Sequence, residues 1–434
     1  MFTTSIYAFR SFGRNARLFL LTLALATLII DGVYAVVFNL YLLRLGYDAA
    51  FIGQINSAGL LVFAMASLPA GELGKRWGSR RAMIVGLFIV LAGSLTLPLA
   101  GLWLPAWQSA WLMAAYVTMF LGYAVFFVNG VPFLMGATTP EQRNHAFAAQ
   151  TAIFSVAAFA GGIVAGTLPA LVARVTGMST MDPMPYRVPL MVAALLLIPG
   201  IVTAVRTTQD LPPRRPRSRI NLLKRIGTFD RTYLHLLLAV SVVRILQVGG
   251  MAAANTFFNV YMDQGLHVPT AQIGLIASLA RILSVPAALS VALLATRWGQ
   301  RNLVILAGVA TVISLLPLAL LPFWGAAAAG FIGITAAASI RYPAFLVYTM
   351  EMVTEEQRPT MSGLSEMTAG IAFSSMALIG GYVITNIGYT AHFLIGAGAV
   401  SLGTLVFAVY FRKPRGIAAR TTVHAPQPVS LAAD

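Results

Sequence analysis

Long apolar runs separated by short polar segments dominate the chain. The runs at 18–30 and 188–205 are two of them, and neither has the strict apolar–polar alternation of a half-buried strand. About 20 apolar residues in a helix cover a hydrocarbon core of about 30 Å at 1.5 Å rise per residue. Because backbone polar groups in lipid must bond within their own segment, these runs predict membrane-spanning helices.

The pattern predicts an all-α polytopic membrane protein. The twelve expected helices lie at 18–43, 51–73, 82–104, 108–136, 145–173, 187–205, 232–262, 271–294, 303–324, 326–351, 360–387 and 389–411. A proline- and arginine-rich stretch interrupts this series and predicts a linker. The expected division is a tail at 1–16, a six-helix bundle at 17–205, a basic linker at 206–231, a second six-helix bundle at 232–411 and a tail at 412–434.

Composition agrees with this pattern, because 58% of the residues are hydrophobic and only 10% are charged. Soluble chains are about 25% charged, so an ordinary soluble domain is excluded. The net charge of +16 would favour nucleic-acid binding in a soluble protein. Here 23 of the 29 Lys and Arg residues fall on the tails, the linker and the even-numbered connections, and only Arg44, Arg174 and Arg187 fall on the other face. This bias predicts an inner-membrane protein with cytoplasmic termini and no nucleic-acid partner.

Short motifs of the first six helices return in the last six. Phe-Asn-Leu-Tyr at 38–41 returns as Phe-Asn-Val-Tyr at 258–261, an offset of 220. Gly53 returns as Gly274, and Trp77 returns as Trp298, both with an offset of 221. Glu-Gln-Arg at 141–143 returns at 356–358, an offset of 215. These landmarks predict two related six-helix bundles, with the axis between them along the membrane normal.

With these landmarks the chain resembles the major facilitator superfamily over about residues 15–412. The signature of that family, Gly-x-x-x-Asp-Arg-x-Gly-x-Arg-Arg, is matched at Gly71, Arg76, Gly78, Arg80 and Arg81. The resemblance implies that two bundles carry a solute by alternating access. It also implies a cytoplasmic gate, whose expected residues are Gly71, Glu72, Lys75, Arg76, Gly78, Arg80, Arg81, Arg143, Arg297, Gly299, Arg301 and Arg358.

The chain departs from the family pattern at three places. Lys75, with Thr296 in the second half, stands where the family has an acid that helps to lock the cytoplasmic ends. Glu72, one turn earlier, is the candidate replacement. Helix 5 lacks the Gly-Pro motif of drug exporters, and Thr118 is nearest the place of their helix-4 arginine. Both absences weaken the multidrug-exporter interpretation, which stays open as an alternative.

Charged side chains inside membrane helices are costly and therefore mark candidate functional positions. The predicted helices contain Asp31, Arg244, Arg281, Arg341 and Glu366. Asp31 and Arg281 lie at comparable depth and are expected to face one another through the central cavity. Arg341 and Glu366 come from neighbouring helices and are expected to form a local pair. A purely structural role is the alternative for both pairs.

Uncharged polar side chains in the helices are further candidates for a substrate or ion pathway. They are Asn39, Asn129, Gln247, Asn255 and Asn259. Hydrogen bonding between helices is the alternative role for each. Because Asn39 and Asn259 are repeat-related, we expect them to share a structural task, such as capping the outer helix ends.

The sequence contains no evident catalytic or metal-binding set. It has no cysteine, and its five histidines lack metal-ligand spacing to one another or to Asp and Glu. No glycine-rich phosphate-binding loop ends in Lys-Ser or Lys-Thr, which argues against direct use of ATP. We therefore expect no enzyme activity, no cofactor and no metal.

These observations predict a secondary active transporter of a small organic solute. Protons are the expected coupling ion, because a buried carboxylate such as Asp31 can titrate when its charge is desolvated. Three intramembrane arginines against two carboxylates motivate the hypothesis of an anionic or carboxylate-bearing solute, with neutral and cationic amphipaths as the alternatives. A multidrug or amphipath efflux antiporter is one alternative, and a membrane sensor or assembly protein with a transporter fold is another. The expected partners are the lipid bilayer, the solute and protons, with the chain acting as a monomer.

Overall fold

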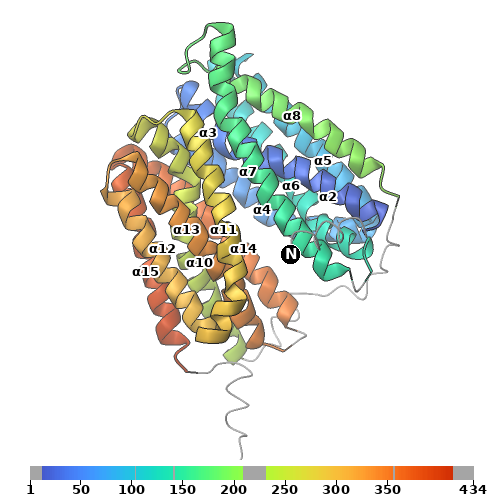
Figure 1. Cartoon of the computed structure of the whole chain (residues 1–434), viewed down its shortest axis with the longest axis vertical. Helices are drawn as coiled ribbons and strands as arrows, with labels where there is room; N and C mark the ends of the chain where they lie inside the picture. Colours follow the sequence, from blue (N-terminus) through green and yellow to red (C-terminus); the bar gives the residue numbers. More distant parts are fainter. Residues whose placement is uncertain (1–11, 103, 140–141, 209–230, 355–356, 414–434) are drawn as a thin grey trace, which may run out of the picture.

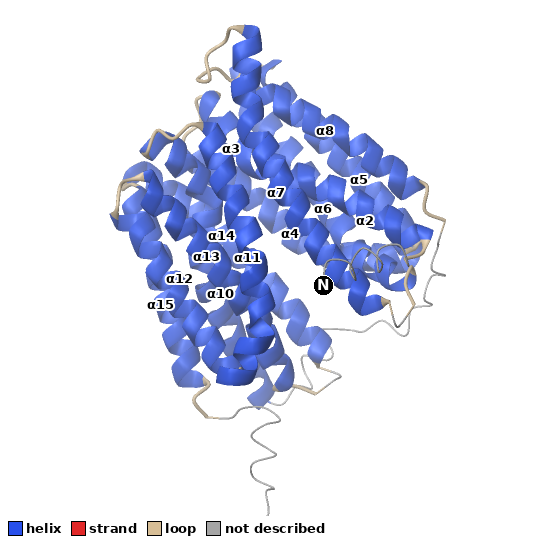
Figure 2. Ribbon diagram, viewed as in Figure 1, coloured by secondary structure: helices blue, strands red, loops and turns tan. Residues whose placement is uncertain are grey.

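The computed structural model describes residues 12–102, 104–139, 142–208, 231–354 and 357–413. Most of these residues are helical, and no strand occurs within the described ranges (Figure 2). Within the described part of the chain, twelve segments are long and apolar enough to cross a membrane. The all-α prediction of twelve spans is therefore confirmed. Most of the predicted linker and of the two tails lies outside the described residues.

The first bundle holds six of the spans. Its first span consists of α2 (Arg14–Thr27), the π-helical segment η1 (Leu28–Tyr34) and α3 (Ala35–Arg44). The other five are α4 (Ala49–Trp77), α5 (Ser79–Thr96) with the 3-10 segment η2 (Leu97–Leu102), α6 (Pro105–Gly136), α7 (Arg143–Thr176) and α8 (Met184–Val205).

The second bundle repeats this order. Its spans are α10 (Arg231–Val260) with the π-helical segment η3 (Tyr261–Gly265), α11 (Thr270–Trp298), α12 (Gln300–Leu320), α13 (Trp324–Glu351), α14 (Arg358–Asn386) and α15 (Tyr389–Tyr410).

A glycine with positive φ separates the second and third spans of each bundle. Gly78 has a φ of 87° between α4 and α5, and Gly299 has a φ of 77° between α11 and α12. A side chain is strained at such φ values, so glycine permits the tight reversal. The Trp-Gly dipeptide repeated in the sequence thus marks the same turn in both bundles.

The bundles lie side by side, the blue-to-green helices of the first next to the yellow-to-red helices of the second (Figure 1). Their main mutual contacts are α4 with α14 and α7 with α11. We name the end of the molecule that carries Val205 and Arg231, where α8 ends and α10 begins, the linker face, and the other end the opposite face. In Figure 1 the bundles converge toward the opposite face and diverge toward the linker face.

At both of these main contacts, a glycine of one bundle packs against a glycine of the other. A Cβ added to Gly53 of α4 would lie 3.0 Å from the Cα of Gly381 of α14. A Cβ added to Gly274 of α11 would lie 2.7 Å from the Cα of Gly166 of α7. Small residues let helix backbones approach closely in membranes. Because Gly53 and Gly274 are repeat-related, the two crossings are equivalent parts of one arrangement.

Candidate functional site

An ion pair joins the bundles at the opposite face. Arg44, the last residue of α3, donates from its two terminal nitrogens to the two carboxylate oxygens of Asp263, at 2.7 and 2.6 Å. Both side chains are only 9% exposed. The same guanidinium donates to the Tyr186 hydroxyl at 3.2 Å, and that hydroxyl lies 2.8 Å from Thr270 Oγ1 of α11. A bidentate pair of this kind adds geometric specificity to the attraction between the charges, so it holds the two bundles in register.

The two repeat-related asparagines form reciprocal hydrogen bonds between the bundles. Asn39 Nδ2 donates to the Thr256 carbonyl at 2.9 Å. Asn259 Nδ2 donates to the carbonyls of Ala35 at 2.7 Å and Val36 at 3.3 Å. Thr256 follows Val36 by 220 residues, the offset of the asparagines themselves, so the bonds obey the repeat. The two asparagines thus share a structural task, as expected, but that task is not the capping of outer helix ends, because both join one bundle to the other.

Serine side chains also form hydrogen bonds between the bundles, farther from the opposite face than the asparagines. Ser57 Oγ of α4 lies 2.8 Å from Ser374 Oγ of α14. Ser278 Oγ of α11 donates to the Phe159 carbonyl of α7 at 3.0 Å. We call the Arg44–Asp263 pair and these asparagine and serine bonds together the seal.

Sequence reasoning missed most of the seal. Ser57 and Ser278 are separated by 221 residues, the offset of Gly53 and Gly274, so the repeat held a signal for them. Asp263 carried no such signal, because its repeat counterpart is Leu43.

At the linker face, the predicted gate acid Glu72 forms ion pairs with residues of its own helix. Glu72 pairs with Lys75 at 3.6 Å and with Arg76 at 3.3 Å, all three in α4. The three side chains are 46%, 64% and 71% exposed. Exposed pairs three or four residues apart contribute little stability. Among the described residues, Glu72 therefore forms no ion pair between the first bundle and the second in this conformation.

Two gate arginines also bond inside one bundle. Arg80 donates to Thr207 Oγ1 at 3.0 Å and to the Val205 carbonyl at 2.7 Å, which ties α5 to the end of α8. Arg301 donates to the Ala408 carbonyl at 2.7 Å, which ties α12 to α15. The remaining predicted gate residues are Gly71 within α4, Gly78 and Gly299 at the turns, Arg143 and Arg358 at the starts of α7 and α14, and the exposed Arg81 and Arg297.

Asp31 lies in the π-helical segment of the first span. Such segments are frequent at functional sites. A Cβ added to Gly32 would lie 2.6 Å from the Cα of Gly161, so α7 packs directly against this segment. The Tyr123 hydroxyl of α6 donates to Asp31 Oδ2 at 2.8 Å. Sequence reasoning missed Tyr123, since no repeated or charged position marked it.

Arg281 of the second bundle interacts electrostatically with both Asp31 and Tyr123. The described residues include no ion pair within 4.0 Å between Arg281 and Asp31. The structure thus brings the two predicted partners near each other without direct contact. A carboxylate, a phenol and a guanidinium from three helices and two bundles form this group.

The charges of the second bundle do not form the expected Arg341–Glu366 pair. Glu366 instead accepts a hydrogen bond from the Tyr342 hydroxyl at 2.9 Å and interacts electrostatically with Arg244. The Arg244 Cζ lies 5.1 Å from the ring centroid of Tyr342 and 5.3 Å from that of Phe345. The charged neighbour of buried Arg341 is Arg244. Which partners these charges find depends on how each helix is rotated about its axis. The position of a residue along its helix does not reveal that rotation.

The other polar candidates differ in what they do. Asn129 Nδ2 donates to the carbonyls of Ala70 and Val125, each at 2.9 Å, and so ties α6 to α4. Gln247 is fully buried, and neither atom of its amide has a partner. Asn255 is exposed. Helix-to-helix bonding therefore occupies Asn129 and the two asparagines of the seal, while Gln247 stays unsatisfied.

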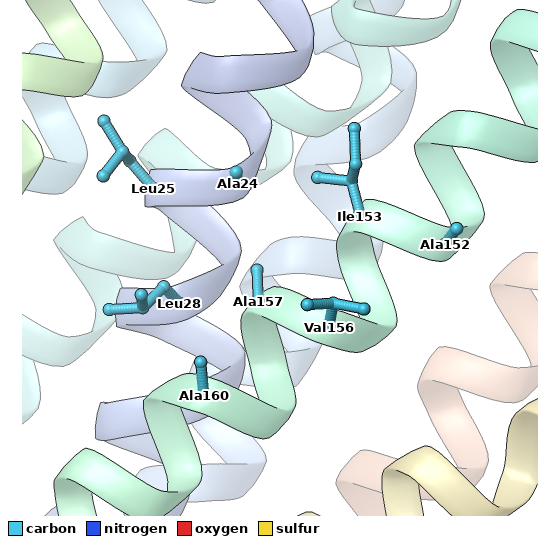
Figure 3. A pocket seen from close by; sticks show the side chains of 8 residues that line it. All are labelled: Ala24, Leu25, Leu28, Ala152, Ile153, Val156, Ala157 and Ala160. Carbon is cyan, nitrogen blue, oxygen red and sulfur yellow. The ribbon is translucent and has the colours of Figure 1, made fainter. Parts of the chain in front are cut away.

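A cavity of about 400 Å³ opens between the first span, at α2 and the start of η1, and α7. Its lining is Ala24, Leu25, Leu28, Ala152, Ile153, Val156, Ala157 and Ala160 (Figure 3). None of these side chains is polar, and none belongs to the charged groups described above. The cavity suits hydrocarbon and offers no group to orient a polar solute.

A duplicated twelve-span fold closed at one face defines a multi-pass membrane transporter. The sequence profile of the Major Facilitator Superfamily matches residues 18–243 and 240–433. The chain therefore belongs to this superfamily. No curated protein sequence matches the chain.

Solved structures of transporters share the fold at low sequence identity. The nucleoside transporter NupG superposes with a TM-score of 0.68 at 16% identity, covering 92% of this chain and 98% of its own. The D-xylose-proton symporter gives 0.68 at 11% identity, covering 94% and 97%. A POT family transporter in complex with a thioalcohol-conjugated peptide gives 0.70 at 14% identity, covering 93% and 99%. At such identities the likeness concerns the fold alone.

Proposed function

We propose that the protein is a proton-coupled secondary transporter of a small organic solute, working as a monomer in the inner membrane. The observation that carries this proposal is the one-sided seal. Its contacts join the bundles near the opposite face, while at the linker face the bonds that Glu72, Arg80 and Arg301 make to described residues stay inside their own bundle. Alternating access requires a contact set of this kind, which one conformation makes and the other releases.

The orientation of the cycle follows from charge. With 23 of the 29 Lys and Arg residues on the linker side, the linker face is cytoplasmic and the seal faces outward. The described conformation is then the inward-facing one. Opening the seal and joining the linker-face helix ends would give the outward-facing one.

Asp31 is the proposed proton site. Its carboxylate lies between a hydrogen-bond donor of its own bundle, Tyr123, and a cation of the other bundle, Arg281. Protonation removes the attraction between Asp31 and Arg281 and so weakens an interaction between the bundles. Arg281 is then available to an anionic group of the solute, which couples proton movement to solute movement.

Flux into proteoliposomes tests the proposal. The purified chain would be reconstituted, and uptake measured with and without an imposed pH gradient. The solute panel would include mono- and dicarboxylates, phosphate monoesters, nucleosides, pentoses, short peptides and cationic dyes. Gradient-dependent uptake of one class supports the proposal. Uptake restricted to cationic amphipaths would favour multidrug efflux instead, and no uptake of any solute would favour a sensor or assembly role.

A further inference from the structure

The second bundle contains two buried arginines that the seal and the Asp31 group do not use. Arg244 of α10 is 4% exposed and Arg341 of α13 is 2% exposed. Arg244 lies 13 residues from Arg231 at the linker face, about 20 Å at helical rise. Arg341 lies 10 residues from Glu351, about 15 Å from the same face. Both guanidiniums are therefore inside the membrane-spanning part of the bundle.

The hydrogen-bonding groups of these arginines are incomplete. The Nε of Arg244 and the Nε and one terminal nitrogen of Arg341 are buried without a partner. One turn further along α10, both atoms of the Gln247 amide are also buried and unpartnered. Buried donors without acceptors are costly, and those of a charged group cost most.

The charges of this cluster do not balance either. The Arg244 guanidinium lies over the rings of Tyr342 and Phe345, one and four residues after Arg341 on α13, and the two cations repel each other. The one carboxylate among their described neighbours is Glu366, which is exposed and accepts the hydrogen bond of Tyr342. Two buried cations thus share a single peripheral anion, and the cluster has the charge and the free donors to accept a further one.

The first bundle has no equivalent of this cluster. Counting back by 220 residues for α10 and by 215 for α13 and α14, the matched positions are Ala24, Phe126 and Thr151. A twelve-span transporter fold forms around those neutral residues in one bundle, so the fold itself does not require the arginines in the other.

We infer that Arg244 and Arg341 form a binding site for an oxyanion, a carboxylate or phosphate group, inside the second bundle. The planar guanidinium presents donors in the fork that these groups accept. The site rests on the proposed function in one respect: the oxyanion is that of the transported solute. Arg244 and Arg341 hold the oxyanion in either protonation state, and Arg281 adds its charge to the same anion only when Asp31 takes a proton.

Anion binding to the full-length protein in nanodiscs tests this site without any transport. The probes are inorganic phosphate and succinate, titrated at constant ionic strength against choline chloride and followed by calorimetry and thermal shift. Wild type should bind at least one probe. Arg341→Gln should weaken that binding roughly 10-fold or more, because hydrogen bonds to charged groups are the strong ones. Arg341→Lys should recover only part of it, since an ammonium lacks the fork.

Two further variants make the test independent of how well Arg341→Gln folds. Glu366→Gln removes the competing carboxylate and should tighten binding. Arg174→Gln, which removes an exposed cation at the far end of α7, should leave binding unchanged. Retained tight binding in Arg341→Gln, together with loss in Arg281→Gln, would place the anion at Arg281 and overturn the inference.

The two proposals can fail separately. If neither probe binds wild type, or if all variants bind equally, the oxyanion site is wrong even where proteoliposomes show proton-driven uptake. If the probes bind as expected and no solute is transported, the site stands and the proposed transport function fails. Phosphate binding without succinate binding would identify a phosphate-bearing or inorganic anion as the occupant.

Discussion

The seal and the intramembrane charges follow opposite rules of symmetry. The seal is largely duplicated: Asn39 and Asn259 bond reciprocally, and Gly53 and Gly274 make equivalent crossings. The charges are single. The repeat counterparts of Asp31, Arg281 and Arg244 are Met251, Leu60 and Ala24.

This difference separates two tasks. Closing one face is a mechanical task that both bundles share, and repeated residues can perform it from both sides at once. A proton or an anion can be bound by a charge that is present in one bundle only, so the free-energy cost of burying that charge arises once. Positions that depart from the repeat are therefore the better guide to chemistry in this chain, and positions that keep it are the better guide to the interface, with the Arg44–Asp263 pair as the exception.

The largest expected effect comes from removing the unduplicated carboxylate. Asp31→Asn keeps a polar side chain beside Tyr123 but cannot lose a proton. Proton-driven uptake in proteoliposomes should fall by roughly 10- to 100-fold, the range for losing one charged hydrogen-bonding group. Uptake should also become insensitive to the pH gradient. Asp182→Asn, at an exposed acid of the opposite-face loop, is the matched control. Unchanged gradient dependence in Asp31→Asn would remove Asp31 from the coupling mechanism.

The next effect concerns the one charged pair within the seal. Arg44→Gln leaves Asp263 mostly buried without its cation, and breaking such a pair costs up to about 3–5 kcal/mol. The outward-facing state should gain population. Because the chain has no cysteine, spin labels at Met178→Cys and Ile387→Cys would report the opposite-face separation alone. Their distance should lengthen in Arg44→Gln, and the double change Arg44→Asp with Asp263→Arg should restore it in part. A distance that did not change would show that the pair does not hold the seal.

A smaller effect tests the symmetry itself. Asn39→Ala and Asn259→Ala each remove reciprocal bonds that contribute about 1 kcal/mol. The same label pair should lengthen by similar amounts in both variants, and by less than in Arg44→Gln. A large effect from one asparagine and none from the other would mean that the duplicated bonds are unequal in energy.

The smallest effect is expected at the linker face. Glu72→Gln removes two exposed pairs of α4, and exposed pairs contribute about 0–1 kcal/mol. The populations of the inward-facing and outward-facing states should change only slightly. Labels at Trp77→Cys and Trp298→Cys would measure this. A shift as large as that of Arg44→Gln would show that Glu72 joins the bundles in the other state.

The sequence predicted the fold more completely than it predicted the site. Apolar runs and the repeat determine the number of spans and their grouping, because lipid permits few other structures. The comparable depth of Asp31 and Arg281 along their helices also indicated that these residues lie near each other. It did not reveal Tyr123 or the pairing of Glu366 with Tyr342, because these depend on helix rotation and on the π-helical segment. Asp263 escaped notice because its counterpart, Leu43, is apolar.

The glycine crossing of α4 and α14 makes α4 a lever with unequal arms. Gly53 lies four residues from Ala49, a short arm of about 6 Å, and 24 residues from Trp77, a long arm of about 36 Å. A displacement at the short end is therefore amplified about sixfold at the long end for a rigid helix. The basic turn after Trp77 stands where that travel is greatest, and α11 carries the same proportions through Gly274 and Trp298. Sub-ångström adjustments in the seal can thus move the linker-face helix ends by several ångströms.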